Sequence, residues 1–168
     1  MFLKVLMLKQ DDPRKCSAAK LVKFGLAKPV TRTASRTLIL NPFSKKILLK
    51  SDKKFVNSIT GIDCSWNLVT SAFKKPFTGI SRKLPPLLAG NPMNYSKLNK
   101  LSTVEALAGA VYILGEPDLT HNLLQKFKWG NTFFELNKNL LQDYSKAQSE
   151  AEILDICHEY RLDNAQFT

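Results

Sequence analysis

The residues best suited to chemistry in this sequence lie where an apolar segment gives way to polar and aromatic residues. Residues 59–62 predict a buried strand, which runs directly into Asp63, Cys64, Ser65 and Trp66. A carboxylate at the carboxyl end of such a strand lies where α/β proteins usually bind their ligands. Composition alone favours a turn or capping role for Asp63 equally well, and core packing is the commoner role of such a Trp. Asp63 and Trp66 are candidates for a binding site on this pattern.

Two further predicted strands end in a similar way. Residues 37–40 lead into Asn41-Pro42, and residues 84–89 lead into Gly90-Asn91-Pro92. Because the carboxyl ends of parallel strands share one edge of a sheet, three such loops together would form a cofactor cleft. Three ordinary exits from strands would give the same pattern.

Several kinds of catalytic and metal-binding site are excluded by residues that the sequence lacks. It has no Gly-rich phosphate loop, nucleophile elbow or dinucleotide fingerprint. The three cysteines, Cys16, Cys64 and Cys157, form no Cys-x-x-Cys pair, and the two histidines are His121 and His158. We therefore expect neither a disulfide framework nor a bound metal.

The charge of the chain is distributed unevenly. The net charge is +11, but residues 1–92 hold 18 Lys and Arg against four Asp, whereas residues 93–168 hold 7 Lys and Arg against 10 acidic residues. The basic part favours a nucleic acid as partner, bound with release of counterions. A generally basic surface is the alternative. Within this part we expect Asp11, Asp12 and Asp52, which lie in polar stretches, to be solvated.

Ten basic residues are the candidates for contact with a nucleic acid, RNA or DNA, and the prediction concerns the group rather than any single member. They are Arg14, Lys15, Lys20, Lys53, Lys54, Lys74, Lys75, Arg82, Lys126 and Lys128. RNA binding through such a group is expected to weaken strongly as salt is added.

The pattern of apolar residues predicts two lobes, residues 1–92 and residues 93–168. The first alternates apolar and helical stretches, which is typical of an α/β arrangement. Its expected strands are residues 2–8, 37–40, 59–62 and 84–89, and its expected helices are residues 16–24 and 51–57. The second lobe is helical, with helices expected at residues 106–114, 118–127, 131–141 and 150–160. Ser102 and Glu105 form a capping-box pattern before the first of these, and Pro117 suits the first turn of the next.

No apolar segment approaches the roughly 20 residues that span a bilayer. The best candidate, residues 104–114, is too short and contains Glu105. Residues 1–8 include Lys4 and are typical of a strand rather than a signal peptide. We expect a cytoplasmic protein without membrane contact.

Five segments, in this order and at this spacing, resemble those of one family. They are residues 38–42 (LILNP), 61–66 (GIDCSW), 84–95 (LPPLLAGNPMNY), 100–106 (KLSTVEA) and 127–137 (FKWGNTFFELN). The chain is similar, from about residue 12 to residue 145, to the small-subunit rRNA aminocarboxypropyltransferases of archaea and eukaryotes.

The resemblance implies a reaction and a fold. Members of the family transfer the 3-amino-3-carboxypropyl group of S-adenosylmethionine to N3 of a uridine-type base in small-subunit rRNA, which is an N1-methylpseudouridine in eukaryotes. The implied fold is an α/β, SPOUT-like N-terminal lobe with a deep trefoil knot, followed by an all-helical C-terminal lobe. The cofactor is expected at the junction of residues 1–92 and residues 93–168. The partner is expected to be small-subunit rRNA or a pre-ribosomal particle, and the protein a monomer.

Fourteen positions of this chain are expected to contact the cofactor, thirteen by correspondence with the family and Val69 because it lies one helical turn after Trp66. They are Ser17, Leu40, Pro42, Ile62, Asp63, Trp66, Val69, Leu84, Leu87, Leu88, Leu101, Ser102, Thr103 and Ala106. Ser17 is expected near the methionine carboxylate. We expect Trp66 to pack against the methyl and sulfonium groups, with Val69 closing that pocket. Two positions depart from the family pattern, because Asn99 and Asn131 stand where relatives often have an aromatic residue and a His, respectively.

Asp63 is the one candidate for a catalytic residue, either as a base for the imide proton or as a ligand of the cofactor's amino group. Binding is the preferred role, because a carboxylate is a far weaker base than an imide anion. Two other functions stay open. One is a SPOUT-like RNA methyltransferase, and the other is a non-catalytic RNA-binding factor of ribosome assembly.

Overall fold

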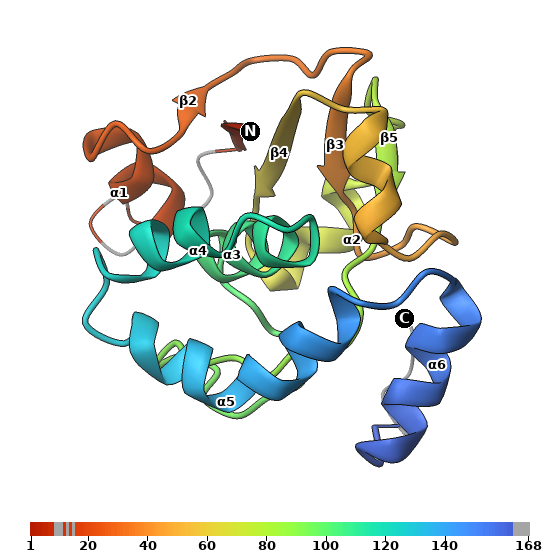
Figure 1. Cartoon of the computed structure of the whole chain (residues 1–168). Helices are drawn as coiled ribbons and strands as arrows, with labels where there is room; N and C mark the ends of the chain where they lie inside the picture. The colour runs from red at the N-terminus through yellow and green to blue at the C-terminus, as the bar shows by residue number, and fades with distance from the viewer. Residues whose placement is uncertain (9–11, 13, 15, 163–168) are drawn as a thin grey trace.

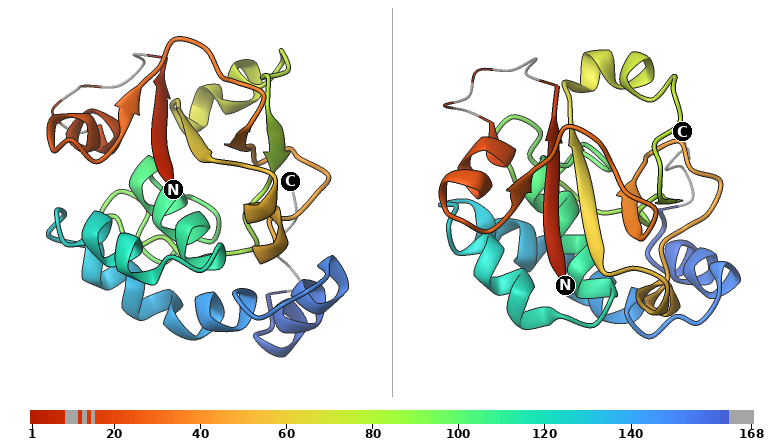
Figure 2. Two further views of the ribbon diagram at one scale, coloured as in Figure 1. Left: turned by 45° about the horizontal axis from the view of Figure 1, so that its top comes forward. Right: turned by 90° about the horizontal axis from the view of Figure 1, so that it is seen from above.

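The computed structural model describes residues 1–8, 12, 14 and 16–162. Within them the chain forms one parallel sheet of five strands in the order β2-β1-β4-β3-β5. The strands are β1 (Phe2–Met7), β2 (Lys28–Pro29), β3 (Thr37–Leu40), β4 (Ser58–Asp63) and β5 (Ile80–Arg82). Figure 2 shows β1 and β4 side by side at the centre of the sheet.

The central strands are apolar because helices and loops cover both faces of the sheet. Val5, Leu38 and Ile59 are fully buried. A polar pair inside the sheet joins Thr37 of β3 to Thr60 of β4, whose hydroxyl oxygens lie 2.8 Å apart. This bond satisfies two buried hydroxyls that would otherwise destabilise the core.

Six α-helices surround the sheet in the described part of the chain. They are α1 (Ser17–Lys23), α2 (Val69–Ala72), α3 (Thr103–Ile113), α4 (Pro117–Leu124), α5 (Gly130–Tyr144) and α6 (Glu150–Glu159), and two short 3₁₀ helices are η1 (Lys50–Lys54) and η2 (Trp66–Leu68). Figure 1 shows α3 and α4 side by side below the sheet, with α5 beneath them and α6 at the lower right. α3 is buried along most of its length because it packs against β4, α1, α4 and α5.

The prediction of a SPOUT-like lobe with a deep trefoil knot, followed by a separate helical lobe, is wrong. Across the described residues the chain forms a single α/β unit, which shows neither the knot nor a division into two lobes. Val104 and Leu107 of α3 belong to the same hydrophobic core as Leu21 of α1 and Ile59 of β4. The change of charge near residue 92 therefore separates two stretches of sequence but not two cores.

One predicted strand is also wrong. Residues 84–89 are not a strand, although Leu88 forms an isolated antiparallel bridge with Leu98. Pro85 and Pro86 cannot donate to a ladder, which explains the break. Two strands were not predicted, Lys28–Pro29 and Ile80–Arg82, because each is a short segment with too few apolar residues to be recognised from its sequence. The other predicted strands and helices are confirmed, with small shifts at their ends.

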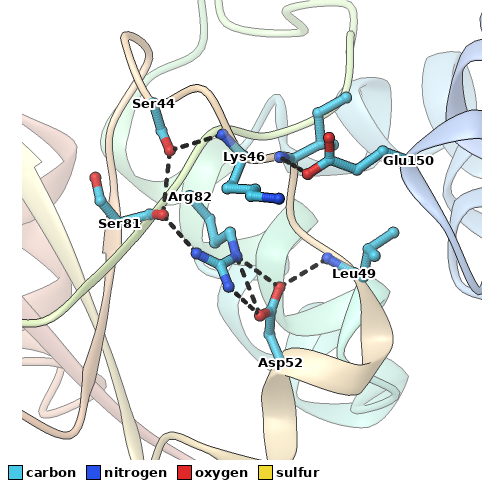
Figure 3. A network of polar contacts seen from close by, with 8 residues as sticks. Ser44, Lys46, Leu49, Asp52, Ser81, Arg82 and Glu150 are labelled. Atoms are coloured by element: carbon cyan, nitrogen blue, oxygen red, sulfur yellow. Dashed lines mark hydrogen bonds and ion pairs between the residues drawn. The ribbon is translucent and has the colours of Figure 1, made fainter.

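Asp52 is not solvated as expected but 5% exposed. Its carboxylate accepts hydrogen bonds from Arg82 Nε at 3.1 Å and from the Leu49 backbone at 3.0 Å, and it lies 2.8 Å from Arg82 Nη2. Figure 3 shows this network, in which Arg82 also donates to the Ser81 carbonyl. The bond from the Ile47 backbone to Glu150 extends it to α6. The network fixes η1 and α6 relative to β5.

None of the helices within residues 1–8, 12, 14 and 16–162 combines the length and the apolar character that a membrane span requires.

Candidate functional site

A cleft of about 820 Å³ opens at the carboxyl edge of the sheet. It is lined by the loops that leave β3 and β4, by the start of α1 and by the segment from Asn91 to Thr103 that leads into α3. A volume of this size suits a ligand as large as a nucleoside with a side chain. The position is the one where open parallel sheets usually bind their ligands.

Asp63 links three elements at the floor of this cleft. Its Oδ1 accepts a 2.7 Å hydrogen bond from Thr103 Oγ1, and its Oδ2 accepts one of 3.1 Å from Cys16 Sγ. Cys16 also caps α1, since its sulfur accepts from the Ala19 backbone N–H at 3.3 Å. Burial, together with the bond to Asp63, raises the pKa of the Cys16 thiol from 9.0 to about 11. Cys16 is therefore a protonated donor at neutral pH, and the Asp63 carboxylate is held between two donors.

Trp66 forms one wall of the cleft with its ring fixed at two points. The indole Nε1 donates a 3.0 Å hydrogen bond to the Leu101 carbonyl. Lys100 Nζ lies over the ring, 4.7 Å from the centroid, in a cation–π contact. Val69 begins α2 one turn after Trp66 and also lines the cleft.

α1 and α3 meet at the cleft through Ser17. The Ser17 hydroxyl accepts a 3.2 Å hydrogen bond from the backbone N–H of Val104, in the first turn of α3. Gly61 of β4 permits this approach, because a Cβ there would lie 3.1 Å from Thr103 Cγ2. The starts of both helices are thus held against the end of β4.

Glu105 is a residue whose role the sequence showed only in part. The capping-box pattern is confirmed, because Ser102 donates to its carboxylate through both the backbone N–H and the hydroxyl. The same carboxylate accepts from the backbone N–H groups of Gly90 and Asn91, at 2.7 and 2.9 Å, and from the Asn91 side chain at 2.7 Å. Glu105 is fully buried. Five donors on two loops therefore converge on one side chain behind the cleft.

Twelve of the fourteen residues predicted to contact the cofactor line the cleft, and two do not. Leu87 is fully buried in the core. Leu88 uses its backbone N–H and carbonyl in a pair of 2.8 Å hydrogen bonds with the Asn137 side chain of α5. Both lie in the segment that was wrongly predicted as a strand.

The two positions that depart from the family pattern have different surroundings. Asn99 lines the cleft in a left-handed conformation, with φ of 59°, which Asn adopts more readily than most residues. Its side-chain oxygen accepts from the Leu87 backbone at 3.3 Å. Asn131 is exposed in the first turn of α5.

The predicted RNA-binding residues differ in how far their charges are already paired. Lys15 lies outside the described residues. Arg14 pairs with Asp12 at 3.2 Å, and Lys53 pairs with Glu116 at 2.8 Å, which holds the pKa of Glu116 below its usual value. The guanidinium of Arg82 forms an ion pair with Asp52. Of the others, Lys20 is partly buried on α1, whereas the rest are exposed, namely Lys54, Lys74, Lys75, Lys126 and Lys128.

Within the described ranges, no group of three or more His, Cys, Asp and Glu side chains has an arrangement that could hold a metal ion. A family model described as a possible Fer4-like domain in RNase L inhibitor matches residues 4–35. Cys16 is the only cysteine in that segment. A single cysteine cannot supply the ligands of an iron–sulfur cluster.

Comparison with known proteins gives consistent matches over nearly the whole chain. A family model described as the C-terminal part of a ribosome biogenesis protein matches residues 38–161. The 16S rRNA aminocarboxypropyltransferase of Methanococcoides burtonii is 40% identical over 163 residues, which cover 94% of each chain. The protein of the same name from Sulfurisphaera tokodaii is 43% identical over 149 residues, covering 88% of this chain and 87% of the relative.

A solved structure agrees with these matches. The SAM-dependent rRNA:acp-transferase Tsr3 from Vulcanisaeta distributa superimposes with a TM-score of 0.85 at 34% identity, covering 97% of this chain and 90% of that one. The fold, the sequence and the family model thus agree, and this chain belongs to the family of 16S rRNA aminocarboxypropyltransferases.

Proposed function

We propose that this chain transfers the 3-amino-3-carboxypropyl group of S-adenosylmethionine to N3 of a uridine or (methyl)pseudouridine in small-subunit rRNA. Its relatives are named for this transfer to 16S rRNA, and the similar solved structure is described as SAM-dependent. The observation that carries the proposal is the cleft, which collects Ser17, Asp63, Trp66 and Thr103 at the edge of the sheet. We further propose that it acts in the cytoplasm as a monomer, on small-subunit rRNA or a pre-ribosomal particle.

The residues around the cleft fit S-adenosylmethionine. The Asp63 carboxylate suits the ammonium group, and the Ser17 hydroxyl suits the carboxylate. The Trp66 ring offers a π face to the sulfonium, a contact worth about 2 kcal/mol when desolvated. When bound, S-adenosylmethionine supplies an electrophilic γ-carbon, so that the new N–C bond forms as the C–S bond breaks, methylthioadenosine leaves and the N3 proton is released to water.

The protein's own contribution is to select one of three electrophilic carbons on the sulfonium. Trp66 and Val69 cover the methyl group, which leaves the γ-carbon open to the RNA. The ring of Trp66 can do this because Leu101 holds its Nε1 at 3.0 Å. Orientation of this kind can supply several kcal/mol of the barrier, about 7 or more where alignment is good.

Asp63 is proposed to bind the amino group rather than to remove the imide proton. Its two oxygens already accept from Thr103 and Cys16, an arrangement that fixes the orientation of the carboxylate. Asp63→Asn separates the two roles. We expect S-adenosylmethionine to bind at least about tenfold more weakly to this variant, with turnover at saturating cofactor largely kept. Normal affinity with lost turnover would identify Asp63 as the base.

The reaction itself is tested with S-adenosylmethionine labelled separately on the carboxyl carbon and on the methyl group. The enzyme is incubated with unmodified small-subunit rRNA and with precursor particles. We expect the carboxyl label in RNA and the methyl label on methylthioadenosine. Methyl label in RNA would identify a methyltransferase, and binding without transfer to either substrate would identify a non-catalytic assembly factor.

A further inference from the structure

Next to the cleft, three phenylalanine rings form a connected row on the surface. We infer that this row, Phe43, Phe73 and Phe77, is a stacking surface for unpaired nucleotides that flank the target base. The inference rests on the proposed function, because it assigns the path of the RNA at the same site. It goes further in naming a surface that reads single-stranded character rather than charge alone.

The middle ring of the row, that of Phe73, contacts both of the others. Phe73 lines the cleft itself. Its ring lies 5.9 Å from that of Phe43 at an interplanar angle of 65°, and 5.5 Å from that of Phe77 at 75°. Phe43 is 46% exposed. Edge-to-face packing of this kind holds the rings together while it leaves the Phe43 ring exposed to solvent.

The exposed ring is held by a rigid turn. Asn41 directly follows β3, and its side-chain oxygen accepts a 2.9 Å hydrogen bond from the Phe43 backbone N–H. The Asn41 amide donates to Ser81 Oγ at 3.0 Å, which ties the turn to β5. The Ser44 hydroxyl donates to the Ser81 carbonyl at 3.1 Å. Phe43 is thus preorganised on the surface, so that a base stacking on it would order little new structure.

The charge around the row fits a polyanion. Lys45 and Lys46 follow Phe43, Lys74 and Lys75 follow Phe73, and all four are exposed. No acidic residue occurs between Asp63 and Glu105 in the sequence. The carboxylate of Glu150, on α6, is already engaged, since it accepts from the Ile47 backbone N–H at 3.1 Å.

Aromatic rings between lysines favour single-stranded RNA over a duplex or a protein. Paired bases are stacked on each other and cannot reach a side-chain ring, whereas bases in loops and bulges can. Lysines that alternate with the rings supply contacts to the phosphates between successive bases. Because Phe73 also lines the cleft, a base stacked there would lie directly beside the nucleotide that enters it.

The test compares two exposed phenylalanines that differ in position. Phe43→Leu removes the π face and keeps an apolar side chain, and Phe43→Tyr keeps the face. Phe2→Leu is the matched control, because Phe2 is 75% exposed at the amino end of β1, on the opposite edge of the sheet. Binding is measured by fluorescence anisotropy with a labelled single-stranded RNA and with the same RNA annealed to its complement, over a range of salt concentrations.

We expect Phe43→Leu to weaken binding of the single strand by about 5- to 100-fold, the range measured for loss of one base–aromatic stack. The salt dependence should keep its slope, and duplex binding should stay within about twofold. Phe43→Tyr and Phe2→Leu should bind like the parent protein. By contrast, Lys74→Ala should lower the salt slope by about one.

The inference is overturned if Phe43→Leu binds the single strand as Phe2→Leu does, or if it loses single strand and duplex equally. A protein partner of this surface would give the first result. The dual-label transfer assay, run on the same variants, keeps the two proposals apart. If the parent protein transfers the group and Phe43→Leu binds RNA normally, only the stacking surface is contradicted. If the parent protein transfers nothing, the proposed function is contradicted.

Discussion

Thr103 Oγ1 donates a 2.7 Å hydrogen bond to Asp63 Oδ1, across 40 residues of sequence. The bond joins the first turn of α3 to the end of β4, and it uses one of the two oxygens of the carboxylate at the floor of the cleft. The Asp63 carboxylate is therefore already oriented before a cofactor binds to it. Preorganisation of this kind lowers the cost of binding, since no side chain has to be ordered when the ligand arrives.

Removal of the Thr103 hydroxyl should therefore weaken cofactor binding. Thr103→Val keeps the shape of the side chain but leaves Asp63 with one donor fewer. We expect S-adenosylmethionine to bind roughly tenfold more weakly, because a hydrogen bond to a charged group contributes about 1.5 kcal/mol or more. Thr103→Ser, which keeps the donor, is the control. Titration calorimetry measures both, and equal affinity in the two variants would contradict the prediction.

Cys16 should be unreactive at neutral pH despite its place in the cleft. Its thiol pKa is raised to about 11, so iodoacetamide should label it slowly at pH 7–8 and faster only as the pH approaches 11. Since the folded protein holds this proton above the unfolded pKa near 9, the Cys16 contribution to stability should be lost as the pH rises from about 9 to about 11.

Peptide mass mapping gives the labelling rate, and urea unfolding at each pH gives the stability. Cys16→Ser is the matched variant, because serine can also cap α1 and donate to Asp63 without titrating in this range. Between pH 9 and pH 11, the Cys16→Ser variant should therefore lose less stability than the parent protein, because it lacks the titrating thiol. Rapid labelling at pH 7 in the parent protein would show that Cys16 is a thiolate.

Glu105 should be one of the most sensitive positions for stability. Glu105→Ala leaves buried N–H groups of Gly90 and Asn91 without an acceptor and removes the cap of α3. We expect a loss of about 3–5 kcal/mol in the free energy of unfolding, measured by urea denaturation. Glu135→Ala removes an exposed partner of Lys138 and should change stability by less than about 1 kcal/mol. Similar losses in the two variants would rule out the proposed role of Glu105.

The elements that could be predicted from sequence are those with local signals. Pro42 marks the end of β3 at Leu40, and Pro117 begins α4. The apolar run of residues 84–89 was misread because it is buried by α3 and α5, not by strand pairing, and a short apolar run does not distinguish the two. The five-strand sheet also depends on Ile80–Arg82, a short strand that pairs with β3.

For the candidate site, the sequence predicted which residues take part but not the contacts between them. Asp63 and Trp66 were recognisable at the end of a strand, and the family resemblance supplied most of the cleft. Their partners were not recognisable, since Cys16 contacts Asp63 across 47 residues and Trp66 contacts Leu101 across 35. Such contacts depend on tertiary packing, which leaves no periodic trace in the sequence. For the same reason Asp52 was expected to be solvated, although Arg82 pairs with it from 30 residues away.

Arg82 should matter for stability more than for RNA binding. Arg82→Met leaves the buried Asp52 carboxylate without its counter-ion, and we expect a loss of about 3–5 kcal/mol. Asp52→Asn added to this variant should restore part of that loss, because it removes the unpaired charge. Lys53→Met is the control, since its exposed pair with Glu116 contributes about 1 kcal/mol at most. A stable Arg82→Met protein with a reduced salt slope for RNA would instead support a direct contact with phosphate.

Lys100 should affect the affinity of the cleft for S-adenosylmethionine relative to its affinity for methylthioadenosine. Its ammonium lies over the Trp66 ring, 4.7 Å from the centroid, where it competes with the sulfonium of S-adenosylmethionine for the same π system and repels its charge. Neither effect acts on methylthioadenosine, which is a neutral thioether.

Lys100→Met should therefore raise the affinity for S-adenosylmethionine relative to methylthioadenosine by about two- to fivefold, which corresponds to the 0.5–1 kcal/mol of an exposed cation–π contact. Lys97→Met, a change at another exposed lysine of the same segment, should leave the ratio unchanged. If the ratio of the two dissociation constants is the same in Lys100→Met and in the parent protein, the sulfonium does not share the Trp66 ring, and selection of the γ-carbon must rest on another wall of the cleft.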